Sequence, residues 1–237
     1  HRHQLLPSDE SFRNSYNYCF TAIGEINNLL VQYPDLESLN AELSVLRALI
    51  YLWLIDSFGN VPIITEESLG GNPSNSPRQE VFDFIERSIL DNVELLSKEP
   101  TKTTMNYYTA HAILAKLYLN AEVYTGTPRW ADAEAAADVV ISGPYSLSSN
   151  FFANFATRNG GSTENIFTLP YDENNAGGFN LAQMTLHYEN QFTYDLQEQP
   201  WNGYASLEEF YNNFDDADIR KQAFIEGDQF SSSGAGY

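Results

Sequence analysis

The chain has little cysteine and few basic residues, and both shortages narrow its function. Cys19 is the only cysteine among 237 residues, so the chain can form no internal disulfide and no metal site of cysteine ligands. Lys and Arg together number 12 against 32 Asp and Glu, a formal net charge of −20 at pH 7. A field of this sign repels phosphodiester backbones and anionic lipid headgroups. Nucleic acid and electrostatic adhesion to a membrane are therefore not expected.

Long apolar runs and familiar catalytic motifs are also missing from the sequence. No apolar stretch approaches the roughly 20 residues that span a bilayer, and the start lacks the basic and apolar segments of a signal peptide. No glycine-rich phosphate loop, Gly-x-Ser-x-Gly elbow or His-Glu-x-x-His helix is present. We expect no metal site, no cofactor and no enzymatic activity, although the sequence leaves a structural calcium ion open.

Apolar and aromatic residues, by contrast, are plentiful and recur at helical spacing. The hydrophobic fraction of 43% and the aromatic fraction of 14% exclude global disorder. The pattern predicts helices at about 11–31 and 39–57, and the second is apolar all round, so it belongs in the core. Arg47 and Asp56 near its ends must find partners or water. Gly59 and Pro62 then end this helix.

Further helices are predicted between residues 77 and 141. Ser76 and Gln79 form a capping box around Pro77, which predicts a helix from 77 to about 96. Apolar stripes at 107–124 and 130–141 predict a helical pair, and the turn between them resembles that of a tetratricopeptide repeat. Ordinary antiparallel packing would give the same stripes. We expect a mainly α fold, with tetratricopeptide-like pairs in a scaffold at residues 1–145 and little β structure.

Beyond residue 145 the helical period is lost, and Gly, Asn and Ser mix with aromatic residues. Residues 146–237 are expected to form an irregular, loop-rich, ligand-facing region packed on the scaffold within one structural domain. Residues 166–171 (IFTLPY) can be an edge strand at best, because Pro170 cannot donate to a ladder. Ser206 and Glu209 form a second capping box, which predicts a short helix.

Six motifs in order resemble a known family. They are SYNYCFTAIGEINNLL, LRALIYLWLIDSFGNVPIIT, SPRQEVFDFIERSIL, AHAILAKLYLNAEVYTGTPRWADAEAAADVVISGPYSL, ENIFTLPYD and ASLEEFYNNFDDADIRK. Their order over residues 11–225 is similar to that of SusD/RagB proteins, which are surface glycan-binding lipoproteins. The resemblance implies lipid anchoring at the outer membrane and delivery of captured glycan to a SusC-like TonB-dependent transporter. It also implies that this chain is a fragment without the leader, the anchor and the C-terminal part.

The candidate glycan-binding residues lie in loops. A pyranose offers a face of C–H groups that can lie on an aromatic ring, and a rim of hydroxyls that pair with amides. The turn at 201–204 supplies rings and an amide, and the Gly-rich loop at 66–76 supplies amides. The candidates are Trp201, Asn202, Tyr204, Asn72, Asn75 and Asn180. Two other functions stay open: a helical-repeat scaffold for a peptide or protein partner, and a glycoside hydrolase, which needs only two facing carboxylates.

Overall fold

The computed structural model describes residues 6, 9–68, 70–71, 73–171, 174 and 181–229, in two compact units. Unit 1 is His1–Ser148 with Gly160–Thr168, and unit 2 is Ser149–Asn159 with Leu169–Tyr237. The described residues form α-helices, 3-10 turns and an isolated bridge, and no strand occurs among them. The predicted mainly α fold is confirmed. The predicted division into scaffold and ligand-facing region remains a prediction.

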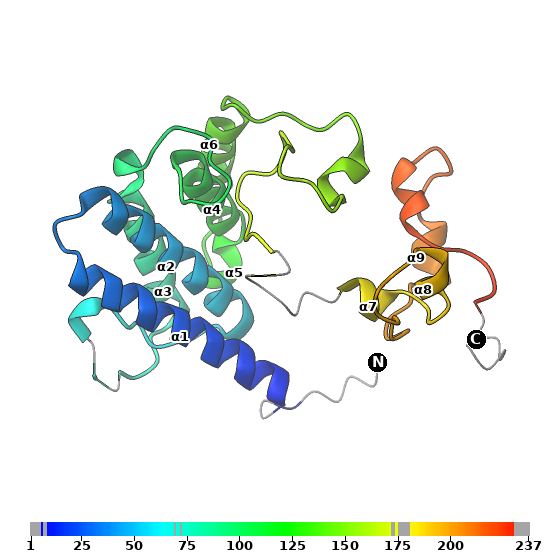
Figure 1. Ribbon diagram of the computed structural model, residues 1–237. Coiled ribbons are helices and arrows are strands. Elements are labelled where there is room, and N and C mark those ends of the chain that lie inside the picture. The colour runs from blue at the N-terminus through cyan, green and yellow to red at the C-terminus, as the bar shows by residue number, and fades with distance from the viewer. Residues whose placement is uncertain are drawn as a thin grey trace. The chain divides into compact units, whose positions relative to one another are not determined.

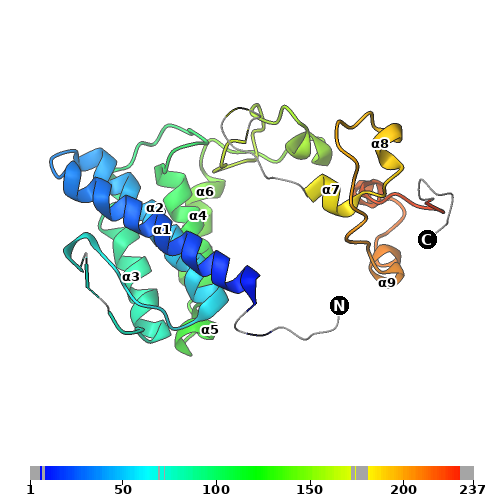
Figure 2. The same ribbon diagram turned by 60° about the horizontal axis from the view of Figure 1, so that its bottom comes forward.

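Unit 1 is a stack of packed helices (Figure 1). Helix α1 lies along α2, α2 packs on α3, and α4 packs on α6, an arrangement that Figure 2 shows from a second direction. The elements are α1 (Glu10–Gln32), α2 (Glu37–Phe58), η1 (Glu66–Ser68), α3 (Arg78–Leu90), η2 (Val93–Leu95), α4 (Tyr107–Leu119), α5 (Ala121–Thr125) and α6 (Trp130–Ile141).

Helix α2 is the centre of the core of unit 1. Its buried side chains include Val45, Ala48, Leu52, Leu54 and Ile55. Contrary to the expectation from the sequence, α2 is long and apolar enough to cross a membrane. Of its most apolar window, however, 56% is buried inside the protein, as a helix apolar on most sides requires in a helical core.

A buried polar network anchors the segment that follows α2. Arg47 is only 5% exposed, and its Nη1 donates to Asn27 Oδ1 of α1 at 2.6 Å and to Glu66 Oε2 of η1 at 2.5 Å. Asn27 Nδ2 donates to the Ile64 carbonyl at 3.1 Å, and the Ile64 N–H donates to Tyr51 Oη at 2.7 Å. The expected partners of the buried guanidinium are thus confirmed, and they join α1, α2 and the 64–66 segment.

The start of α3 is capped differently from the prediction. Asn60 Oδ1 accepts the Arg78 N–H at 3.0 Å, and α3 has no side-chain bond from its own N-cap. The Ser76 N–H donates to the Val61 carbonyl at 2.9 Å in the isolated bridge. The predicted capping box of Ser76 and Gln79 is therefore wrong. Ser76 is held in extended pairing, and the side chain of Asn60, just after α2, accepts the N–H at the start of α3 that has no partner within the helix.

The predicted helical pair at 107–141 is present with one break. Helix α4 ends at Leu119, and α5 restarts at Ala121 and stops before Gly126, whose φ of 78° suits glycine. In α5, the Tyr124 hydroxyl donates to Asp56 at 2.9 Å, which supplies the expected partner of that carboxylate. The packing of α4 on α6 is the helical pair that the stripes predicted.

A second charged cluster joins α3, α4 and α6. Arg129 contacts Glu86 of α3 and Asp132 of α6 at 2.6 Å each. Its guanidinium lies 4.3 Å from the centre of the Tyr118 ring of α4, a cation–π contact. The Tyr118 hydroxyl donates to the same Glu86 carboxylate at 2.8 Å. One arginine thus links three helices at the surface of unit 1.

Unit 2 has shorter elements and an aromatic cluster of its own. The rings of Phe214 and Phe224 lie 5.3 Å apart, and Phe210 packs on both. The predicted capping box at Ser206 is wrong, because α9 has no side-chain cap and the serine hydroxyl faces the Leu207 carbonyl. The described elements are η3 (Phe151–Phe155), α7 (Leu181–Thr185), α8 (Asn190–Thr193), α9 (Glu208–Asn212) and η4 (Ile219–Ala223).

The predicted edge strand at 166–171 does not form. Thr168 of this segment donates its N–H to the Lys102 carbonyl at 2.7 Å, but no ladder follows among the described residues.

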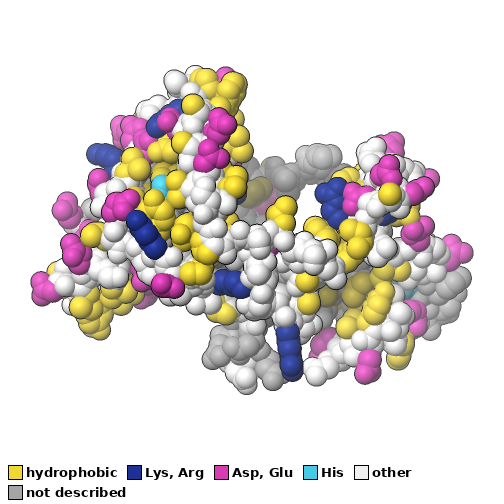
Figure 3. All heavy atoms as spheres, turned by 90° about the horizontal axis from the view of Figure 1, so that it is seen from above, with side chains coloured by type: hydrophobic (Ala, Val, Ile, Leu, Met, Phe, Trp, Pro, Cys, Tyr) yellow, Lys and Arg dark blue, Asp and Glu magenta, His cyan; other side chains and the backbone are white. Residues whose placement is uncertain are grey.

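The surface carries the charge imbalance of the composition: acidic side chains are spread over the face in Figure 3, and Lys and Arg are few.

Candidate functional site

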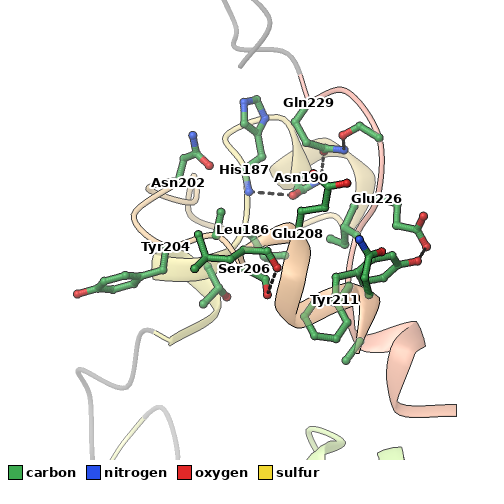
Figure 4. Close-up of a pocket in the computed structure, with 18 residues that line it drawn as sticks. Leu186, His187, Asn190, Asn202, Tyr204, Ser206, Glu208, Tyr211, Glu226 and Gln229 are labelled. Atoms are coloured by element: carbon green, nitrogen blue, oxygen red, sulfur yellow. Dashed lines mark hydrogen bonds between the residues drawn. The ribbon is translucent and has the colours of Figure 1, made fainter. Parts of the chain in front are cut away.

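Unit 2 contains an open cleft of about 800 Å³ (Figure 4). Three segments line it: 185–190 from the end of α7, 202–212 up to the end of α9, and 223–229 from the end of η4. The size falls within the range of about 300–1,000 Å³ typical of small-molecule sites. The lining combines apolar side chains with amides, and the amides are Asn190, Asn202, Asn212 and Gln229.

One side of the cleft is held by a buried polar turn. Asn190 is 5% exposed, and its Oδ1 accepts the N–H of the equally buried His187 at 2.9 Å. The Asn190 Nδ2 points to Gln229 Oε1 at 3.4 Å, and Figure 4 shows these two amides side by side. His187 Nδ1 in turn accepts the Glu189 N–H at 3.2 Å. These contacts fix the orientation of the amides before any ligand arrives.

The opposite side is the 201–204 turn, which main-chain bonds tie to the end of α7. The C-terminal carbonyls of a helix lack partners within the helix, and this turn supplies them. The N–H groups of Trp201, Asn202 and Tyr204 donate to the carbonyls of Gln183 at 2.5 Å, Leu186 at 3.0 Å and Met184 at 2.9 Å. The backbone of the turn is therefore held by α7 and not by its own side chains.

The turn also depends on the backbone angle of one residue and on the missing side chain of another. Asn202 has a φ of 52°, a left-handed conformation that Asn tolerates better than most residues. A Cβ on Gly203 would lie 3.1 Å from the Met184 carbonyl oxygen, so glycine allows the close approach. Trp201 and Tyr204 are 51% and 53% exposed, so the turn displays two rings to solvent.

The predicted site residues have different places in the structure. Asn202 and Tyr204 line the cleft, with the Tyr204 ring extending outward from its rim in Figure 4. Trp201 precedes them in the same turn but does not line the cleft. Asn75 is exposed in a loop of unit 1. Asn72 and Asn180 lie outside the described residues.

Sequence reasoning missed several lining residues. Asn190 and Gln229, and Tyr211 and Glu208 around α9, form the cleft together, yet no periodicity marks them. The available signal is compositional: amide and hydroxyl side chains are dense between residues 187 and 229, close to the aromatic residues of α9 and to Phe224.

The cleft carries negative charge. Glu208 and Glu226 line it, and no Lys or Arg is among the described lining residues. The Tyr211 hydroxyl donates to Glu226, and this hydrogen bond, with desolvation, raises the pKa of Tyr211. Lys221 lies 4.7 Å from the centre of the Tyr211 ring but pairs with Asp216 at 2.5 Å. The nearby cation is thus already matched by a carboxylate outside the cleft lining.

The acidic residues after α9 serve local structure. Asp218 accepts the Arg220 N–H at 2.9 Å at the start of η4, and the two side chains form an ion pair at 2.5 Å. The hydrogen bonds from Arg220 lower the pKa of Asp218 to about 2. No group of three or more His, Cys, Asp or Glu side chains suited to a metal occurs within the described ranges.

Comparison with known proteins gives a consistent set of relatives. Residues 1–119 match the SusD-like family described as "Starch-binding associating with outer membrane". The starch-binding protein SusD of Bacteroides thetaiotaomicron is 34% identical over 130 residues, which cover 53% of this chain and 23% of that protein.

Solved structures agree in fold. A SusD superfamily protein from Bacteroides fragilis superposes with a TM-score of 0.76 at 21% identity, covering 92% of this chain and 52% of that one. A laminarin-binding SusD-like protein gives a TM-score of 0.57 at 25% identity, covering 65% and 37%. The chain thus spans about half of the first structure and about a quarter of the curated relative.

Proposed function

This chain belongs to the SusD-like family of starch-binding proteins that associate with the outer membrane, and we propose that it captures oligo- or polysaccharide at the cell surface without cleaving it. The resemblance drawn from the sequence motifs is confirmed by this membership. Attachment through a lipid anchor and delivery of the captured glycan to a SusC-like TonB-dependent transporter belong to the same proposal.

The observation that carries the proposal is the composition of the unit 2 cleft. Amides from α8, the 201–204 turn and the 223–229 segment meet around one opening of about 800 Å³. Such groups match the donor and acceptor rim of a sugar, and exposed rings of Trp201 and Tyr204 suit its C–H face. The main-chain anchoring of the turn keeps these groups in place, which reduces the ordering cost of binding.

The environment of the cleft carboxylates favours binding over hydrolysis. A glycosidase needs a general acid that stays protonated near neutral pH, which burial in an apolar pocket achieves. Glu208 and Glu226 are both exposed to solvent. Neither has the apolar surroundings that a general acid requires.

The proposal is tested by isothermal titration calorimetry and affinity electrophoresis against a panel of soluble starch, laminarin, xyloglucan and cellulose derivatives. We expect dissociation constants in the micromolar to millimolar range, about 4–8 kcal/mol. Chromatography of the incubated glycans is expected to show no shorter products. Release of oligosaccharides would replace the proposal with hydrolysis, and binding of peptides with no glycan binding would favour the helical-repeat scaffold.

Matched variants locate the site. Tyr204→Ala is expected to weaken binding by up to about tenfold, since an aromatic contact contributes about 0.5–1.5 kcal/mol. Tyr18→Ala removes a ring from α1 of unit 1 that is 72% exposed, more than Tyr204, and is expected to leave affinity unchanged. Equal effects of the two substitutions would place the site elsewhere.

A further inference from the structure

The charges of the unit 2 cleft are one-sided. Its described lining residues include two acidic side chains, Glu208 and Glu226, and no Lys or Arg opposes them. The Lys and Arg residues of the whole unit are Arg158, Arg220 and Lys221. Arg220 pairs with Asp218 and Lys221 with Asp216, so two of the three cations are already matched.

The two cleft carboxylates differ in their surroundings. Glu226 accepts a hydrogen bond from Tyr211, and Lys221 lies against the ring of that tyrosine. Within the described part of the chain, Glu208 has no ion pair. In Figure 4 its side chain extends toward the amides Asn190 and Gln229. A ligand group that reaches these amides therefore lies close to the Glu208 carboxylate.

We propose that this cleft selects uncharged saccharides over saccharides that carry carboxylate or sulfate groups, with Glu208 as the specificity-determining residue. The inference rests on the proposed glycan-binding function and adds the class of glycan. Neutral hydroxyls can donate to a carboxylate oxygen, so Glu208 is a favourable neighbour for an uncharged sugar. A carboxylate or sulfate group on the sugar has no proton to donate there and brings a like charge.

The size of the discrimination follows from Coulomb's law. Two like unit charges about 4 Å apart in a water-like medium disfavour each other about fivefold, and the lower effective dielectric near a protein surface increases this factor. We expect the anionic glycan to bind about five- to tenfold more weakly at low salt. The difference should shrink as salt is raised, because the Debye length falls from about 30 Å at 0.01 M to about 3 Å at 1 M.

The test compares hydroxyethyl and carboxymethyl derivatives of the same polysaccharide at equal degrees of substitution. Starch and cellulose serve as the parent polysaccharides, and the two substituents are similar in size but differ in charge. The readout is the dissociation constant of the carboxymethyl form divided by that of the hydroxyethyl form, measured for each protein variant. A general change in affinity cancels in this ratio, so the ratio reports charge discrimination alone.

Two isosteric variants of α9 complete the experiment. Glu208→Gln removes the charge inside the cleft, and we expect the ratio to fall about threefold or more toward one. Glu209→Gln removes the same charge from the next residue, which does not line the cleft, and we expect its ratio to stay near that of the unaltered chain. Far-UV circular dichroism confirms that both variants are folded.

The outcomes separate the two proposals. Equal or tighter binding of the carboxymethyl form, or equal effects of the two variants, would overturn the charge selection while leaving glycan capture intact. Absence of binding to any parent polysaccharide or derivative would overturn the proposed function, and the selectivity with it.

Discussion

Replacing Arg47 with methionine is expected to destabilise unit 1 by about 2–4 kcal/mol. Breaking a buried ion pair by removing one partner typically costs about 3–5 kcal/mol. Here the Glu66 side chain is 36% exposed, so water recovers part of the loss. The fully buried Asn27 also loses its hydrogen-bond donor, which costs about 1–3 kcal/mol when an acceptor is left unpaired. Methionine keeps much of the apolar volume, so cavity formation adds little.

The measurement is a urea titration followed by far-UV circular dichroism, which reports mainly the long helices of unit 1. Arg13→Met is the matched control, because Arg13 forms an exposed pair with Glu10 at 3.8 Å and should lose less than about 0.5 kcal/mol. In the double variant Arg47→Met/Glu66→Gln no carboxylate is stranded, so its loss should be about 1 kcal/mol smaller than the sum of the single losses. If Arg47→Met matches the control with an unchanged m-value, the network does not hold the segment after α2.

The same pair sets a dependence of stability on pH. Burial raises the pKa of Glu66, but the hydrogen bonds and the charge of Arg47 outweigh it and lower the pKa below the ordinary value of 4.5. A lowered folded-state pKa gives stability that is present above the unfolded value and is lost as the pH falls through the folded value. The unaltered chain should therefore have a higher free energy of unfolding than Glu66→Gln near pH 7, and this difference should shrink below about pH 4.5. An advantage that stays constant down to pH 3 would contradict the pairing.

Three further predictions concern single contacts. Arg129→Met should lower the free energy of unfolding by about 2 kcal/mol in the same urea assay, because it leaves two carboxylates without their cation and removes a cation–π contact. A loss below about 0.5 kcal/mol would show that solvent screens the charges of this cluster. Asn60→Ala should cost about 1 kcal/mol and Ser76→Ala only a few tenths, because the asparagine caps α3; the reverse order would restore the serine as the cap. Gly203→Ala should weaken glycan binding about fivefold with an unchanged helical signal, because its Cβ presses on the α7 carbonyl; unchanged affinity would separate the turn from the site.

The helices of unit 1 could be predicted because apolar periodicity records which face is buried. The predicted ranges 11–31, 39–57 and 130–141 lie within two residues of α1, α2 and α6. Helix ends were less accessible to sequence reasoning. Ser76 is a residue type that often caps helices, but the Arg78 N–H donates to Asn60, which lies 18 residues away in the chain. A motif of neighbouring residues cannot predict a partner so far away.

The partners of Arg47 and the composition of the cleft could not be predicted for a related reason. Asn27 and Glu66 lie 20 and 19 residues from Arg47 along the chain, and tertiary packing alone brings them to one guanidinium. In unit 2, short elements leave no period to follow. Asn202 and Tyr204 could be proposed because ring and amide stand in one turn, whereas Asn190 and Gln229 meet across 39 residues.

The way in which α7 holds the 201–204 turn bears on how ligand preference can be altered. Because main-chain N–H groups make the anchoring bonds, most side-chain exchanges at 201 and 204 would alter what is displayed without loosening the support, proline excepted. Gly203 cannot be exchanged in this way, because any side chain there would press on the Met184 carbonyl. A combinatorial library restricted to the displayed positions would therefore vary the groups that the turn presents at small cost in folding.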